Sequence, residues 1–187
     1  MSRYRLAIAI VCGIAALSIC GHGSAHGVHK DDDMERSVAQ LRHAEGRWDV
    51  VTEFLDEDGT VSRSVNGSYE FRWVVPDRVL SGRSEIPELR QVVGLLFYID
   101  EAEREIEMVS VGADGKLWVM SGPLGGDQRT SQEFETADGK TARLRFTRFN
   151  VSDNTFESRM DFTEDGGETW IPGNHQLFRR AEDPQGP

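Results

Sequence analysis

Hydrophobic and charged side chains alternate in short runs along most of the chain, from about residue 46 to residue 180. Between 69 and 75, for example, Tyr69, Phe71 and Trp73 occupy every second position, with Glu70 and Arg72 between them. A period of two predicts a strand with one buried and one solvated face. We therefore predict strands at 46–56, 66–75, 78–86, 91–99, 104–112, 116–122, 129–136, 140–151, 155–163 and 168–180.

Turn sequences separate these runs at the spacing of an all-β domain. Asp-Gly occurs in four of them, at 58–59, 114–115, 138–139 and 165–166. Glycine accepts the positive φ that a tight hairpin needs. Successive hairpins make an up-and-down antiparallel sheet, and closure of so many strands removes its exposed edges. The predicted fold class is therefore all-β, a closed up-and-down antiparallel barrel of about eight to ten strands with a short N-terminal helix.

The helix is predicted immediately before the first strand. Met34, Val38 and Leu41 fall on one side of a helix that begins near residue 33, where an aspartate can cap it, and ends near residue 44. Gly46 then allows the chain to turn from the helix into the strand. Because the apolar stripe is narrow, we expect this helix to lie across one end of the barrel.

The first 25 residues have the pattern of a secretory signal peptide. A basic start precedes an apolar run at 6–19, and small residues follow at 23–25. The run is shorter than the roughly 20 residues that span a bilayer. We predict a signal peptide at 1–25 and an exported protein, periplasmic or secreted. The alternative is lipid attachment at Cys20, although Ile19 stands where a lipoprotein processing site carries a small residue.

Cleavage after Ala25 would remove both cysteines of the chain, Cys12 and Cys20. The mature chain would then have no disulfide and no thiol chemistry. Cleavage also changes the formal net charge from -11 to -13, because it removes two arginines and no acid. Such an acidic chain repels phosphate backbones, so no nucleic acid partner is expected. No transmembrane segment is predicted in the mature form, and the sequence leaves the oligomeric state open.

Beyond the signal peptide, the length suits a single domain with one core. We predict a flexible polar segment at 26–33, a barrel domain at 34–181 and a disordered tail at 182–187.

A barrel of this size has an interior that is either filled by side chains or open to one small ligand. Polar and large side chains that the alternation places inward are the candidate ligand-binding residues, namely Tyr69, Trp73, Ser110, Arg148, Met160 and His175. Alternatives stay open for two of them, an arginine at the barrel rim for Arg148 and a structural histidine near an open end for His175. The aromatic and methionine side chains are equally suited to a packed core.

Motifs for established chemistries are missing from the sequence. It has no Gly-x-Ser-x-Gly, no phosphate-binding loop, no dinucleotide fingerprint and no His-Glu-x-x-His. No catalytic residue, no metal site and no cofactor are therefore predicted. One enzymatic alternative remains, an isomerase or cyclase that uses Tyr69, Arg148 and His175 inside the cavity. A minority hypothesis makes His175 an axial haem ligand.

Residues 163–170 match the Asp-box pattern, Ser/Thr-x-Asp-x-Gly-x-Thr-Trp. In sialidase-like propellers the box recurs from blade to blade, whereas here it occurs once. We interpret it as a structural hairpin rather than as a sign of glycosidase activity.

Several segments carry a family resemblance. Gly46-Arg47-Trp48 after a short helix resembles the lipocalin/calycin signature, and 94–100, 111–116 and 165–170 look like segments of an uncharacterised family of bacterial lipocalin-like barrel proteins. The resemblance covers about residues 35–180. It implies a closed antiparallel barrel with an internal cavity and no catalytic residue. The cysteine pairs of many secreted animal lipocalins are absent here.

Together these observations favour a protein that binds a small apolar or amphipathic molecule inside its barrel. The alternatives are the cavity enzyme described above and a cell-envelope interaction module whose core is filled.

Overall fold

The structure is a computed structural model that describes residues 29–182. The predicted signal peptide, the alternative of lipid attachment at Cys20 and nearly all of the predicted tail lie outside these residues. Within the described part of the chain, no helix combines the length and the apolar character needed to cross a membrane.

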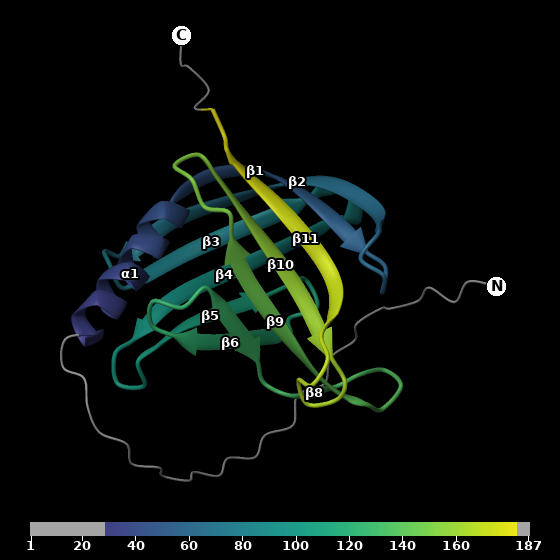
Figure 1. Ribbon diagram of the computed structural model, residues 1–187. Coiled ribbons are helices and arrows are strands. Elements are labelled where there is room, and N and C mark those ends of the chain that lie inside the picture. Colours follow the sequence, from purple (N-terminus) through teal and green to yellow (C-terminus); the bar gives the residue numbers. More distant parts are fainter. Residues whose placement is uncertain (1–28, 183–187) are drawn as a thin grey trace.

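One antiparallel sheet curls into a barrel with a helix at one end (Figure 1). In chain order the elements are α1 (His29–Ala44), β1 (Gly46–Leu55), β2 (Val61–Val75), β3 (Val79–Ile86), η1 (Pro87–Leu89), β4 (Gln91–Asp100), β5 (Glu105–Val111), β6 (Leu117–Pro123), β7 (Gln128–Ser131), β8 (Phe134–Glu135), β9 (Thr141–Phe149), β10 (Thr155–Thr163) and β11 (Ile171–Arg180).

From β1 to β7 each strand pairs with the next one along the chain, and β7 then pairs with β9. The pairs β9–β10, β10–β11 and β11–β1 complete the ring. The two-residue β8 pairs with β9 alone. Among the described residues the ring therefore has ten strands, and the predicted fold class is confirmed.

The predicted turns explain why the hairpins fold locally. The glycines of the four Asp-Gly pairs all have positive φ, from 71° at Gly115 to 82° at Gly59. In the 163–170 hairpin, the Asp165 carboxylate accepts a hydrogen bond of 2.6 Å from the Thr163 hydroxyl and one of 3.0 Å from the Thr169 amide. These hydrogen bonds favour the carboxylate and hold the pKa of Asp165 well below its usual range.

Helix α1 begins at His29, earlier than the predicted start near residue 33, so residues 29–33 belong to the helix. The aspartates at 31–33 suit the positive end of the helix dipole, which favours an early start. The amide of Gly125 donates to the Ser37 hydroxyl over 2.7 Å. At the far side, the Arg42 guanidinium donates to both carboxylate oxygens of Asp77, over 2.8 and 2.6 Å. The helix therefore spans the barrel end between the β6–β7 and β2–β3 turns.

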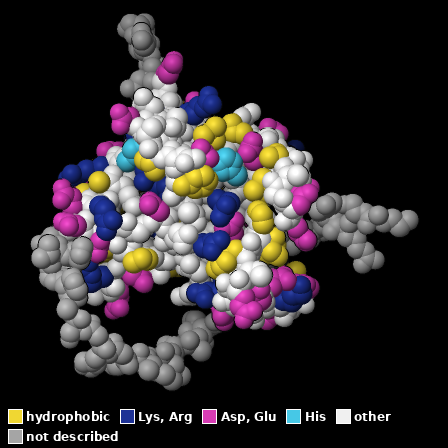
Figure 2. All heavy atoms as spheres, viewed as in Figure 1, with side chains coloured by type: hydrophobic (Ala, Val, Ile, Leu, Met, Phe, Trp, Pro, Cys, Tyr) yellow, Lys and Arg dark blue, Asp and Glu magenta, His cyan; other side chains and the backbone are white. Residues whose placement is uncertain are grey.

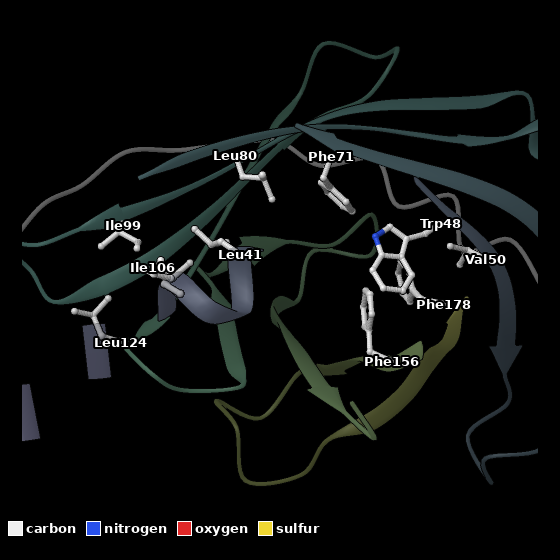
Figure 3. Close-up of a cluster of buried hydrophobic side chains, with 11 residues drawn as sticks. Leu41, Trp48, Val50, Phe71, Leu80, Ile99, Ile106, Leu124, Phe156 and Phe178 are labelled. Carbon is white, nitrogen blue, oxygen red and sulfur yellow. The ribbon is translucent and has the colours of Figure 1, made fainter. Parts of the chain in front are cut away.

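A hydrophobic cluster beneath α1 closes this end of the barrel (Figure 3). Its buried members are Val38, Leu41, Trp48, Val50, Phe71, Leu80, Ile99, Ile106, Leu124, Phe156 and Phe178. Trp48 is fully buried and donates its indole N–H to the Ala44 carbonyl over 2.8 Å, which fixes the helix to β1. Each fully buried aliphatic side chain contributes about 1.5–3 kcal/mol. The predicted stripe of Met34, Val38 and Leu41 on α1 packs into this cluster.

Charged side chains of both signs are spread over the outer face, with hydrophobic ones between them (Figure 2). Ion pairs there join neighbouring turns, such as Arg78 with Glu101 at 2.8 Å, or nearby positions of one strand, such as Arg83 with Glu85 at 2.8 Å. The predicted division into an outer charged face and an inner aromatic face therefore holds for most strands.

Candidate functional site

The barrel encloses a cavity of about 660 Å³. Gln40, Leu41 and Ala44 of α1 line its closed end, which we call the floor. At the opposite end it reaches the segments at 89–92 and 112–114, in the turns after β3 and β5, which we call the mouth. Cavities of this size hold small organic ligands.

Two walls of different chemistry line the cavity. The wall formed by β4, β5 and β6 is mainly apolar and contributes Leu95, Phe97, Met108, Trp118 and Met120, together with the polar Ser110. The wall formed by β1, β2, β3 and β11 adds polar side chains, namely Thr52, Tyr69, Ser84, Asn174 and Gln176. An apolar lining with a few fixed polar groups is typical of ligand sites.

Gln176 organises the polar wall. Its amide nitrogen donates to the Thr52 hydroxyl over 2.9 Å and to the Tyr69 hydroxyl over 3.2 Å. Its amide oxygen accepts from the Ser158 hydroxyl over 3.4 Å. Burial raises the pKa of Tyr69, so its hydroxyl stays neutral and able to donate or accept a hydrogen bond.

Two arginines reach the cavity close to the floor. Arg129 on β7 is only 4% exposed and lines the cavity between the rings of Phe97 and Phe146, whose centroids lie 6.0 and 5.8 Å from its guanidinium carbon. One guanidinium nitrogen donates to the Gln40 amide oxygen over a long 3.3 Å. Its Nε is buried and has no hydrogen-bond partner among the described residues. Desolvation lowers the pKa of Arg129 to about 10, which still leaves the side chain charged at neutral pH.

Arg148 on β9 has a neutral partner instead of a carboxylate. Its Nη2 donates over 2.7 Å to Nδ1 of His43, the residue next to the C-terminal end of α1. His43 in turn donates its Nε2–H to the Ser152 carbonyl over 2.6 Å. Because Nδ1 accepts and Nε2 donates, the imidazole is neutral. Burial and the charges of Arg148 and Arg180 lower the pKa of His43, in agreement with this assignment.

Neither guanidinium has a carboxylate within ion-pair distance among the described residues, whereas many arginines of the outer face do. Desolvation lowers the pKa of both arginines, and the charge of Asp127 only partly offsets this lowering. The Asp127 carboxylate is exposed and accepts a hydrogen bond from Gln40 at 3.1 Å. The floor of the cavity therefore holds two positive charges that the barrel itself leaves without a directly bound counterion.

The structure brings together four of the six sequence-predicted candidates. Tyr69, Ser110, Arg148 and Met160 all line the cavity. Trp73 does not. It packs against the hydrophobic cluster, and its indole N–H donates to the Glu45 carboxylate over 3.0 Å.

His175 also lies outside the cavity, so its expected inward orientation is corrected. Its two ring nitrogens are 2.9 Å from the Glu53 carboxylate and 2.7 Å from the Glu157 carboxylate. Desolvation alone would lower its pKa, but these two carboxylates outweigh it and raise the pKa. With both nitrogens engaged on the outer face, His175 cannot serve as a haem ligand inside the barrel.

The alternation predicts the wrong orientation because the two inward residues that flank His175 are polar. Asn174 and Gln176 face the cavity, while the half-buried Leu177 faces outward with His175. In addition, the β10–β11 pairing shifts its register between Met160 and Asp161, opposite Pro172. The hydrophobic alternation therefore indicated the wrong face.

Sequence reasoning also missed Arg129, Gln176, Gln40 and His43. Arg129 belongs to a strand of only four residues, Gln-Arg-Thr-Ser, in which no hydrophobic side chain marks the inner face. The one available signal was that Arg129 lies in a predicted barrel strand, because every second side chain of such a strand points inward.

No protein-family model and no curated protein sequence matches the chain. Among solved structures, it is similar to the S-type phycobiliprotein lyase of Guillardia theta, with 11% identity and a TM-score of 0.48 over 82% of this chain and 98% of that one. It is also similar to a de novo designed fluorescence-activating β-barrel, with 16% identity and a TM-score of 0.32 over 75% of this chain and 96% of that one. Neither likeness bears on the ligand or the activity of this chain.

Proposed function

We propose that this protein binds a small amphipathic molecule inside its barrel. The observation that supports the proposal is the cavity of about 660 Å³, which runs from the floor beneath α1 to the mouth and has one apolar and one polar wall. A barrel whose role were purely structural would be expected to fill this space with side chains at the density of a protein interior.

Binding is favoured over catalysis because the side chains of the polar wall engage one another. Gln176 donates to the hydroxyls of Thr52 and Tyr69, and the raised pKa of Tyr69 makes its hydroxyl a weaker acid. Of the three groups named for a cavity enzyme, His175 lies on the outer face. Export of the protein, predicted from residues 1–25, remains part of the proposal.

Uptake of a neutral fluorescent probe, N-phenylnaphthylamine, tests the proposal directly. We expect saturable fluorescence enhancement with the wild-type protein, because burial of the probe between the two walls excludes water. Ser110→Trp should abolish the enhancement by filling the cavity from β5. Ser68→Trp is the matched control, since Ser68 is exposed on the outer face of β2.

Met160→Trp provides a second cavity-filling variant from β10, in case Ser110→Trp does not fold, and circular dichroism checks both. Wild-type protein that fails to take up the probe would refute the proposal and favour the interaction module with a filled core. If the probe is taken up, native mass spectrometry of protein from its own host, followed by organic extraction, identifies the natural ligand.

A further inference from the structure

The two arginines at the floor allow the ligand class to be narrowed, an inference that rests on the proposed function. We infer that the ligand is an amphipathic organic acid whose carboxylate binds Arg129 and Arg148 at the floor and whose apolar body extends toward the mouth.

Both positive charges lie at the same end of the cavity. Arg129 and Arg148 both line the cavity, and both lie near the α1 end of their strands: Arg129 contacts Gln40 of α1, and Arg148 contacts His43. Two guanidiniums that converge on one end of an otherwise apolar cavity are a site for an anion.

Both charges are buried without a counterion among the described residues. Burial of an ion without a counterion costs several kcal/mol in a protein. Arg129 is 4% exposed, its Nε has no partner, and its remaining contacts are a long hydrogen bond to an amide and two aromatic rings. Arg148 lies 5.1 Å above the Phe156 ring and donates to a neutral imidazole. A bound carboxylate would supply both the missing charge and the missing acceptor.

The rest of the cavity is mainly apolar. Between the floor and the mouth, Phe97, Leu95, Met108 and Trp118 line one wall, and the Ser110 hydroxyl is the polar group between Leu95 and Trp118. Met108 and Met120 add flexible side chains that adapt to an irregular apolar shape. A charged group at one end and an apolar wall along the length fit a molecule with a single acid group and a hydrophobic body.

The inference is tested by titrating the protein with dodecanoate and with dodecanol, each by displacement of N-phenylnaphthylamine. The two probes share the same chain and differ in the charge of the head group. We expect the wild-type protein to bind dodecanoate more tightly than dodecanol. In Arg129→Met and in Arg148→Met, dodecanoate affinity should fall at least about 30-fold, whereas dodecanol affinity should stay within a few-fold of wild type.

Arg179→Met is the matched control, because it removes the same charge from an exposed position on the outer face of β11. Its dodecanoate affinity should equal that of the wild-type protein. A loss of the same size in Arg179→Met would trace the effect to net charge and overturn the inference.

Two further outcomes separate this inference from the proposed function. Equal affinity of the wild-type protein for dodecanoate and dodecanol would overturn the anion site and leave the binding function intact. Absence of N-phenylnaphthylamine uptake would refute the binding function itself, and the inference with it.

Discussion

The barrel wall around β9 carries arginines on both faces. Those on the outer face have a carboxylate partner, whereas those on the inner face have none among the described residues. On the outer face, Asp161 of β10 is 2% exposed and lies between Arg145 at 2.9 Å and Arg159 at 2.8 Å. On the inner face, Arg148 and its neighbour Arg129 have no carboxylate at ion-pair distance among the described residues. The buried charge of Asp161 on the outer face is therefore neutralised by guanidinium partners, whereas the buried charges of Arg129 and Arg148 on the inner face have no counterion among the described residues.

This difference indicates that the charged residues of the outer face stabilise the fold, whereas those of the inner face are suited to ligand binding. A buried carboxylate with two guanidinium partners holds β9 and β10 together in one register. Buried guanidiniums without a carboxylate partner stabilise the fold less than such an ion pair does. Their presence on the inner face is explained if a bound ligand supplies the missing counterion. Replacement of Asp161 on the outer face should therefore lower the free energy of unfolding. Replacement of Arg129 on the inner face should raise the free energy of unfolding and lower the affinity for an acidic ligand.

The largest effect is expected from Asp161→Ala. Removal of the carboxylate leaves Arg145, which is mostly buried and stacks 4.2 Å above Trp170, without its ion pair. Breaking a buried pair costs about 3–5 kcal/mol, and the partial exposure of Arg159 places this case near about 3 kcal/mol. Chemical denaturation should show this loss. Asp49→Ala, at an exposed position of β1, is the control and should change the unfolding free energy by less than about 0.5 kcal/mol.

The opposite sign is expected for Arg129→Met in the ligand-free protein. Methionine fills much of the same space beside Phe97 and Phe146 without a buried charge. The free energy of unfolding should rise by about 1–2 kcal/mol, after the loss of the Gln40 hydrogen bond is subtracted. Thermal denaturation measures the change. A lower melting temperature for this variant would mean that Arg129 is structural, and the contrast between the two faces would disappear.

A pH effect of moderate size is expected at the floor. The pKa of His43 is lowered from 6.5 in the folded protein, so the unfolded chain takes up a proton there at higher pH than the folded one. Stability from this residue is present above pH 6.5 and is lost as the pH falls through the folded value. His43→Gln should flatten the acid side of the stability profile, because glutamine can accept from Arg148 and donate to Ser152 at any pH.

Guanidine titrations at a series of pH values, on wild type and His43→Gln, measure this difference. Parallel profiles for the two proteins would show that His43 does not titrate differently in the folded state. Arg148 and Arg180 both oppose protonation of His43, while Asp153 favours it weakly.

The smallest effect is expected on the outer face, with the reverse dependence on pH. The pKa of His175 is raised by Glu53 and Glu157, so its contribution is complete below 6.5 and is lost as the pH rises through the folded value. His175→Gln should therefore destabilise the protein in mild acid and have less effect in mild alkali. Because His175 and both carboxylates remain partly exposed and solvent screens their charges, the loss should stay below about 1 kcal/mol. A loss that is equal at both pH values would assign it to packing against Phe149.

Much of the fold could be predicted because its signals are local. An Asp-Gly pair needs only its own backbone to make a turn, and all four such glycines have positive φ. The alternation of Leu144, Phe146 and Arg148 correctly placed Arg148 on the inner face, because the apolar residues there outnumber the polar ones.

The site was harder to predict because its decisive residues break this pattern. Arg129 stands in a strand without hydrophobic neighbours, and Gln176 occupies an inner position that an apolar side chain would normally mark. The alternation along β10 is typical of an outer face at Asp161 and does not indicate that this charge is buried. Asp161 lies on that face but is buried by Arg145 and Arg159, a pairing between strands that alternation along one strand cannot reveal.

The closure of the ring has a consequence for the order of folding. β1 pairs with β11, and the Arg180 guanidinium donates to the carbonyls of Glu45 and His43 over 2.8 and 2.9 Å. The first strand and the end of α1 therefore cannot complete their contacts before the last strand is in place. Contacts between such distant parts of a chain make folding slow, on the scale of milliseconds to seconds. During synthesis the cavity therefore does not exist until nearly the whole chain has emerged, and any ligand can enter only a completed barrel.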